Sequence, residues 1–258
     1  MRGFILKLKG YNSFKTSKKS VTFAGALVFF TLLGLVPTVY LFSLTLSVFG
    51  KELSSFGGFF ITEEFTAVKN FVFEATEKIG ASGSAVLGFI SVYSATSVFV
   101  HLRYIGEVIY DTKKSSTLLI RILSLIGAIL LSLVISFLAV IYAFLSPKFR
   151  AVLGGFGGII NTFIIFIIVF IVIVLLNSFA CPYKIKFKSI IKGSMISCIL
   201  SIVFTIVFLI YLKYFASYDK IYGSVAVIPV FLAWLFIVMR SLVTGMLINA
   251  YNDRKRVK

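Results

Sequence analysis

Arg240 is the residue whose type and position in this sequence most require a chemical explanation. It stands 17 residues into an apolar run that covers 223–250, and no Asp or Glu lies near the centre of any apolar run. Placing an Arg at the centre of a membrane-spanning helix costs about 2.5–3.5 kcal/mol on insertion scales. Because such charges usually face a cavity or a partner, Arg240 is a candidate ligand for an anion. The alternative is a side chain that reaches the nearer headgroups.

Four more polar residues in apolar runs are candidate members of the same substrate-binding site. His101 and Arg103 lie toward the end of the second run, and His101 is expected at a depth similar to that of the central arginine. Arg binds phosphate through paired hydrogen bonds, so the two could hold a lipid phosphate. Asn177 and Asn249 complete the candidate set. The competing interpretation is a packed side chain for His101 and, for Arg103, a side chain that reaches the headgroups. For Asn177 it is a hydrogen bond between helices.

The chain lacks the clusters of residues that catalytic and metal sites require. It has one His and two cysteines, Cys181 and Cys198, which fall on different apolar runs. Neither a structural zinc site nor a redox motif is indicated, and no metal or other cofactor is expected. The glycine-rich stretch 154–158 lacks the Gly-Lys-Ser/Thr ending of a phosphate loop and is interpreted as a turn. No nucleophile paired with a base is visible.

Composition places these residues in a membrane protein. Of 258 residues, 59% are hydrophobic and only 14% are charged, against about a quarter in soluble domains. Six apolar runs each exceed the ~20 residues that cross a bilayer as a helix, and a helix satisfies its own backbone hydrogen bonds in lipid. The sequence therefore predicts an all-α, polytopic transmembrane bundle, a single domain over 1–258. Its spans are 21–48, 84–109, 118–145, 156–180, 190–214 and 223–250.

The distribution of Lys and Arg predicts the orientation of these spans. Eighteen of the 26 basic residues fall in or close beside the N-terminus, the second and fourth connections and the C-terminus, and seven fall in or beside the connections on the opposite side. Because cytoplasmic loops carry the excess of basic residues, both termini are predicted to be cytoplasmic, in a multi-pass protein of the plasma or inner membrane. The net charge of +17 then indicates contact with anionic lipid headgroups at the cytoplasmic face rather than with nucleic acid.

The longest connection, 50–83, is predicted to lie outside and to contain an amphipathic helix. Apolar residues recur at steps of three and four from Phe65 to Ile79, which is the pattern of one helical face. Thr62 is a plausible N-cap for this helix. A helix packed on the outer surface of the bundle or lying in the interface is the favoured interpretation, ahead of a lid over a substrate site.

The last third of the chain carries the most specific motifs: Phe215-Ala216-Ser217-Tyr218, Tyr222-Gly223-Ser224, Trp234, Gly245 and Asn249-Ala250. This set resembles the signature of the YihY/BrkB family of inner-membrane proteins, and within it Ser217, Tyr218, Tyr222 and Gly223 form a motif expected at the outer face. Weaker matches extend the resemblance over nearly the whole chain. They are Ala24-Gly25-Ala26-Leu27 before Pro37, Tyr93-Ser94-Ala95-Thr96, and Pro182 followed by Lys184, Lys186 and Lys188.

The chain departs from the proteins it resembles at two positions. Leu247 stands where they often carry a Glu, and Val100 stands where they often carry an Arg. A mechanism that needs this carboxylate is therefore not expected here. The family is often labelled ribonuclease BN, but the predicted topology leaves only three cytoplasmic acids and one His, too few for a metal-dependent site that hydrolyses phosphodiesters.

The resemblance implies an envelope protein, with transport or lipid handling suggested for its relatives. Together with Arg240, it favours a transporter or translocase of a lipid or another anionic amphipathic envelope substrate. The alternative is a non-catalytic membrane scaffold or envelope assembly factor, and a membrane-embedded enzyme comes third. No pattern in the sequence sets the oligomeric state.

The predicted topology is tested by labelling single cysteines introduced at Glu64, Gly155 and Lys186. A reagent that does not cross the membrane is expected to reach positions 64 and 155 from outside, and position 186 only after permeabilisation. The unsubstituted chain gives the background labelling. External labelling at position 186 would contradict the predicted orientation.

Overall fold

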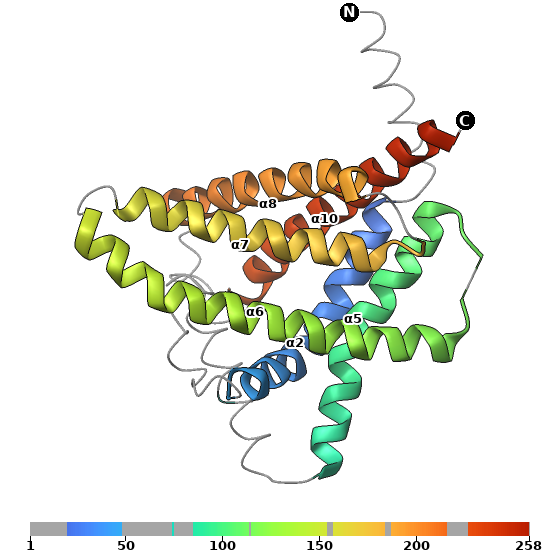
Figure 1. Ribbon diagram of the computed structural model, residues 1–258. Helices are drawn as coiled ribbons and strands as arrows, with labels where there is room; N and C mark the ends of the chain where they lie inside the picture. The colour runs from blue at the N-terminus through green and yellow to red at the C-terminus, as the bar shows by residue number, and fades with distance from the viewer. Residues whose placement is uncertain are drawn as a thin grey trace, which may run out of the picture. The chain divides into compact units, whose positions relative to one another are not determined.

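The computed structural model describes residues 20–47, 74, 85–113, 115–153, 157–183, 187–215 and 227–257. Within these ranges the regular elements are six long α-helices (Figure 1). Their bounds are α2 Ser20–Ser47, α5 Ala85–Tyr110, α6 Thr117–Leu153, α7 Gly157–Ala180, α8 Phe187–Phe215 and α10 Val227–Val257. The all-α prediction is confirmed for the described part of the chain.

Each predicted apolar run corresponds to one of these helices, and the largest differences are at the ends of α6 and α10. Helix α6 continues eight residues past the predicted end at 145, to Leu153. Helix α10 begins at Val227 rather than at 223 and continues seven residues past 250, to Val257, and Pro229 lies in its first turn. Proline is tolerated in the first turn because the N–H groups there have no acceptor within the helix.

Five of the helices are long and apolar enough to cross a membrane. The candidate spans are Ser20–Pro37, Thr117–Tyr142, Ile160–Ala180, Lys188–Tyr211 and Pro229–Asp253. They lie within α2, α6, α7, α8 and α10. The predicted span 84–109 also forms a helix, α5, but α5 is not among the five. A membrane protein is therefore confirmed, whereas the sixth span and the orientation of both termini stay predictions.

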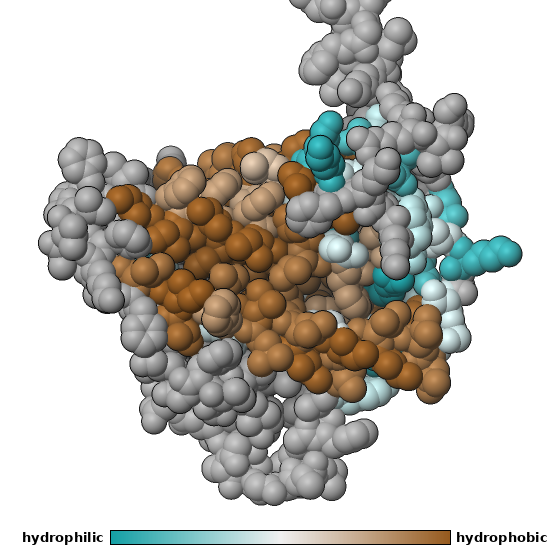
Figure 2. All heavy atoms as spheres, viewed as in Figure 1, coloured by the Kyte–Doolittle hydropathy of each residue, from teal (hydrophilic) through white to brown (hydrophobic). Residues whose placement is uncertain are grey.

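Apolar side chains on several helices point away from the protein. On α6, Leu118 is 74% exposed, and Ile122 and Phe137 are more than half exposed. Figure 2 shows hydrophobic side chains along α6 on the face in view. On α8, Ile206 and Val207 are exposed to a similar degree. Such continuous apolar surface is unfavourable in water, and lipid tails provide its natural cover.

Residue contacts divide the chain into two compact units. The first unit contains 1–31, 100–120 and 173–258, and the second contains 32–99 and 121–172. In the second unit, the Arg121 guanidinium lies 4.5 Å from the centroid of the Tyr93 ring, within the range of a cation–π contact. The prediction of a single domain stays a prediction.

The predicted outer helix, Phe65–Ile79, lies outside the described residues except for Glu74, which is helical. Of the predicted turn at 154–158, residues 154–156 also lie outside the described residues. The other two, 157 and 158, are the first residues of α7.

Helices α8 and α10 of the first unit lie side by side and approach closely at two glycines (Figure 1). A Cβ atom on Gly193 would overlap the carbonyl oxygen of Gly245, and one on Gly245 would overlap Ser197 Oγ. The Ser197 hydroxyl donates a hydrogen bond of 2.8 Å to the carbonyl oxygen of Ser241. Small residues and interhelical hydrogen bonds of this kind are typical of helix pairs in membranes.

The crossing of α8 and α10 predicts a contrast between two Gly→Ala substitutions. Gly245→Ala is expected to lower the thermal midpoint in detergent, because the added methyl group forces the helices apart at a cost of about 1–3 kcal/mol. Gly25→Ala, in helix α2, is the matched control, since a Cβ there would meet nothing within 4 Å. It should leave the midpoint unchanged or raise it. Equal midpoints for the two variants would contradict the tight crossing.

Candidate functional site

Arg240 lies on the exposed side of α10. It sits near the middle of the candidate span Pro229–Asp253, and its side chain is exposed. Pro229 and Ala233, which share its helix face, are exposed as well. Among the described residues no hydrogen bond or ion pair of its guanidinium is found; its backbone oxygen accepts a bond of 2.8 Å from the Thr244 hydroxyl. The side chain is thus exposed. That Arg240 lines an internal cavity and that it binds an anion both stay predictions.

His101 is held by aromatic side chains of the first unit. Its ring stacks on Phe30 of helix α2, with centroids 3.2 Å apart and planes 12° from parallel. The ring of Tyr104, one turn further along α5, meets His101 edge-on at 6.2 Å. This arrangement fits the packed histidine that was the competing interpretation.

Arg103 binds the C-terminal end of α7 rather than a free anion. Its Nη1 donates to the carbonyl oxygens of Phe179, at 2.9 Å, and of Cys181, while Nη2 donates to Pro182 O at 3.1 Å. The last carbonyl groups of a helix receive no hydrogen bond from within the helix, and they carry partial negative charge. A guanidinium is well suited to them, since it offers several donors in one plane. These contacts give Arg103 a role in capping a helix, and the hypothesis that it holds a phosphate stays a prediction.

Gly106 allows α5 to come close enough for this cap to form. A Cβ atom on Gly106 would overlap the carbonyl oxygen of Ala180, the last residue of α7. Gly106 follows Arg103 by three positions and therefore shares its helix face. The cap and the glycine together fix the end of α7 against α5.

Asn177 and Asn249 are buried and bind neighbouring residues of α8. Asn177 is 1% exposed, and its Nδ2 donates to Ser194 Oγ at 3.0 Å. Asn249 is fully buried, and its Oδ1 accepts a bond of 2.8 Å from the Gly193 N–H. Asn177 Oδ1 and Asn249 Nδ2 have no partner among the described residues. Both side chains link helices, which for Asn177 was the competing interpretation; neither contacts Arg240 among the described residues.

The outer-face motif cannot be placed. Ser217, Tyr218, Tyr222 and Gly223 lie outside the described residues. Trp234, which belongs to the same set of motif residues, donates its indole N–H to Thr205 Oγ1 at 3.1 Å and so links α10 to α8.

The segment after α7 is tied down by polar contacts and contains a buried thiol. Cys181 is 5% exposed, and its Sγ donates to the carbonyl oxygen of Tyr183 at 3.1 Å. Burial raises the pKa of the Cys181 thiol, which keeps it protonated at neutral pH. The Tyr183 hydroxyl donates to Asp253 Oδ2 at 2.7 Å. Burial, followed by this hydrogen bond, raises the pKa of Tyr183 above its ordinary value.

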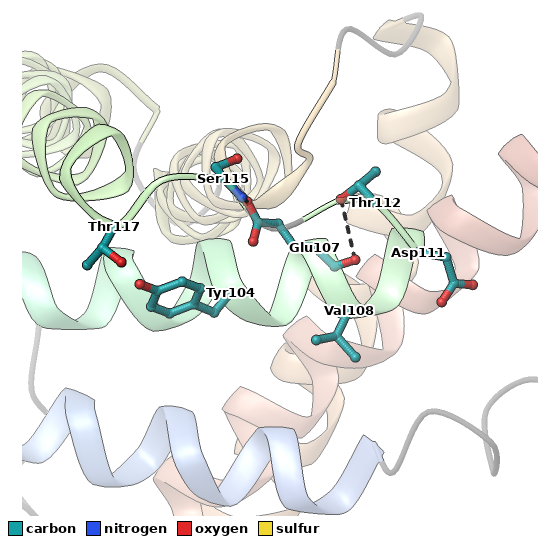
Figure 3. Close-up of a pocket in the computed structure, with 7 residues that line it drawn as sticks. All are labelled: Tyr104, Glu107, Val108, Asp111, Thr112, Ser115 and Thr117. Carbon is teal, nitrogen blue, oxygen red and sulfur yellow. Dashed lines mark hydrogen bonds between the residues drawn. The ribbon is translucent and has the colours of Figure 1, made fainter.

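A pocket of about 550 Å³ lies where α5 ends and α6 begins (Figure 3). Six of its seven lining residues carry side chains with polar groups, and the seventh is Val108. The six are Tyr104, Glu107, Asp111, Thr112, Ser115 and Thr117. Their polar atoms are carboxylate and hydroxyl oxygens, and none of the seven is basic. The pocket is therefore suited to a ligand that brings hydrogen-bond donors or positive charge.

Backbone geometry at the end of α5 shapes this pocket. Asp111 has a φ of 52°, the left-handed conformation that commonly ends a helix. The Thr112 N–H donates to the carbonyl oxygen of Glu107 at 3.0 Å, which is the longer bond of a Schellman motif. Ser116 then starts α6 as its N-cap, because its Oγ accepts the Leu119 N–H at 3.3 Å.

Glu107 is the functional candidate that sequence reasoning missed. It is 2% exposed, and its Oε1 accepts the Ser115 N–H at 3.1 Å, whereas its Oε2 has no partner among the described residues. Figure 3 shows its side chain directed from α5 toward Ser115. In the sequence, Glu107 is one acid at the end of an apolar run. Its burial follows from the turn that folds the α5–α6 connection back over it.

The described residues contain no group of three or more His, Cys, Asp or Glu side chains placed to hold a metal ion.

Leu247 and Val100 are the two positions at which the chain departs from the proteins it resembles. Their side chains are buried, with 0% and 2% of their surface exposed. They contribute apolar packing to the first unit.

Comparison with known proteins identifies one family. Residues 15–258 match the family model described as Virulence factor BrkB. No curated protein and no solved structure matches the chain significantly.

The capping role of Arg103 predicts that Arg103→Met loosens the end of α7. Three hydrogen bonds are lost, and the expected destabilisation is about 1.5–3 kcal/mol, the range for hydrogen bonds to a charged group. Hydrogen exchange measured over 176–183 should become faster. Arg121→Met, which removes a guanidinium of the second unit, is the matched control and should leave exchange there unchanged. Unchanged exchange in Arg103→Met would show that the cap does not hold this segment.

Proposed function

Because this chain belongs to the BrkB family of membrane proteins, we propose that it is a translocase or transporter that binds the phosphate of a membrane lipid at Arg240. One observation supports this proposal above the others. Arg240 is an exposed charge in the middle of a candidate membrane span, and no side-chain partner for it is found among the described residues.

The cost of this arrangement points to an anion that comes from outside the chain. Arg240 is 11 residues from Pro229 and 13 from Asp253, the two ends of the span. At 1.5 Å per residue, this separates it from either end by roughly 16–20 Å of helix. A guanidinium facing hydrocarbon at this depth is unfavourable by about 2.5–3.5 kcal/mol or more. A bound anion offsets this cost.

Lipid phosphate is the anion that a bilayer supplies in quantity. A guanidinium binds phosphate through two parallel hydrogen bonds, which fixes the headgroup in one orientation. The tails of the same lipid would cover apolar side chains that α8, a helix of the same unit, exposes, such as Ile206 and Val207. A headgroup drawn toward Arg240 leaves its leaflet, and lowering the cost of that movement is the action of a translocase. We propose a lipid path along the exposed side of α10, whereas the sequence led to the expectation of an internal cavity.

The second candidate function is a non-catalytic scaffold or assembly factor. The same exposed arginine suits a carboxylate on another polypeptide, since burial of a paired charge between helices also offsets the cost of placing it in the membrane. In that case Arg240 would determine assembly and not lipid movement. An enzymatic activity, including that of a ribonuclease, is not proposed.

The test is translocation of a fluorescent phospholipid in reconstituted vesicles by variants of Arg240. Arg240→Gln is expected to lower the translocation rate about tenfold or more. The reason is that a hydrogen bond to a charged group, worth about 1.5–3 kcal/mol, is lost. Arg240→Lys should recover part of the rate, because it keeps the charge and loses the planar fork. Lys188→Gln removes an exposed basic residue at the end of a candidate span and is the matched control.

Expression and insertion of the Gln variant should match those of the unchanged chain, because a neutral side chain is easier to place in lipid. Full translocation by Arg240→Gln would exclude Arg240 from the mechanism. Unchanged translocation together with a loss of self-association or of a captured partner in that variant would favour the scaffold.

A further inference from the structure

The pocket between α5 and α6 contains a buried carboxylate, and only one of its two oxygens has a hydrogen bond among the described residues. Glu107 Oε1 has one hydrogen bond, from Ser115 N–H, and Oε2 has none from the described residues. Leaving a charged oxygen buried without a donor costs more than 1–3 kcal/mol. A donor that reaches Oε2 from the pocket would remove this cost.

The other polar atoms of the pocket indicate which kind of donor fits. The hydroxyl groups of Tyr104, Thr112 and Thr117 line the same space as the Glu107 carboxylate. A primary ammonium group carries one positive charge and three N–H donors. It can therefore donate both to a carboxylate and to hydroxyl oxygens, whereas a trimethylammonium group has no N–H to donate. We propose that this pocket binds the primary ammonium group of a zwitterionic headgroup of the phosphoethanolamine type.

The start of α6 supplies a place for the phosphate of such a headgroup. Thr117 is the first residue of α6 and lines the pocket. The N–H groups of the first turn have no acceptor within the helix, and the helix dipole adds partial positive charge there. A carboxylate and a helix N-terminus thus present opposite charges within one pocket, which matches a molecule with an ammonium and a phosphate.

The surface beside the pocket points to a lipid as the source of this headgroup. Leu118 and Leu119, which directly follow Thr117, are 74% and 50% exposed. A candidate membrane span begins at Thr117 itself, so the pocket lies at the polar end of a lipid-facing helix. A lipid whose headgroup occupies the pocket would lay its tails along these leucines.

This inference goes beyond the proposed function, because the pocket could select a headgroup whether or not Arg240 takes part in lipid movement. Binding is therefore measured directly, on the purified full chain by native mass spectrometry. The probes are phosphatidylethanolamine, its N,N,N-trimethyl analogue phosphatidylcholine, and phosphatidylglycerol, all with the same tails. The unchanged chain is expected to prefer phosphatidylethanolamine about tenfold or more over each of the others. Equal retention of the three lipids would overturn the proposal, whatever the variants do.

Glu107→Gln is the decisive variant. Its amide oxygen can still accept the Ser115 N–H, so the fold is expected to persist while the charge is lost. The preference for phosphatidylethanolamine should fall at least tenfold. Asp253→Asn is the matched control, since that carboxylate binds Tyr183 and does not line the pocket. It should keep the preference. Because headgroup preference in binding is measured and not translocation, the outcome is separate from the test of the proposed function.

Soluble glycerophosphoethanolamine distinguishes the two sources of the same headgroup. If it competes only at far higher concentration than the lipid, the tails contribute and the source is the membrane. If it binds as tightly as the lipid, the headgroup chemistry stands and the source is a soluble molecule. A preference that survives in Glu107→Gln, or a pocket that takes up Mg²⁺ or Ca²⁺ and no ethanolamine headgroup, would overturn the proposal.

Discussion

The absence of hydrogen-bonding solvent in a bilayer is the constraint on which the rest of this structure depends. Backbone groups are satisfied inside long helices, and what remains open are the helix ends. Much of the described polar chemistry serves these ends. Arg103 caps α7 through three carbonyl groups, a Schellman motif closes α5, and Ser116 begins α6. A polar residue near the end of a span is therefore first a candidate cap and only then a candidate ligand.

The helices were predictable from sequence because one property, a long apolar run, determines them. The partners of the polar side chains were not, since they depend on packing between distant segments. Arg103 reaches carbonyl groups 76 to 79 positions away, which no local pattern encodes. The outward direction of Arg240 was equally hidden, because α10 is apolar over much of its circumference. Asn177 makes the contact between helices that was its alternative interpretation, whereas no pattern in the sequence pointed to the bond that Asn249 makes with Gly193.

The glycines are a second case in which the role of a residue depends on packing between helices and not on the local sequence. Gly106, Gly193 and Gly245 stand where another helix leaves no room for a Cβ atom, whereas Gly25 has open space around it. All four lie within apolar runs, and sequence alone gives no reason to treat them differently. Their roles follow from the approach of α5 to the end of α7 and of α8 to α10. Close approach at glycines brings buried polar groups such as Ser197 and Asn249 within hydrogen-bonding distance of the next helix.

Once caps and contacts between helices are accounted for, some charged groups keep unmet interactions among the described residues. Arg103 Nε and Arg121 Nη1 are buried without a partner, although each guanidinium makes other contacts. The Arg240 guanidinium and one oxygen of Glu107 also keep unmet interactions. Each is unfavourable for the folded chain alone, and a neutral side chain of similar size would remove the cost at either position. Local features that lower stability without an evident gain in packing are concentrated at functional sites. One group is a cation and the other an anion, so a zwitterionic phospholipid carries the complement of each. That shared complementarity makes lipid handling the interpretation that explains both residues with one class of ligand.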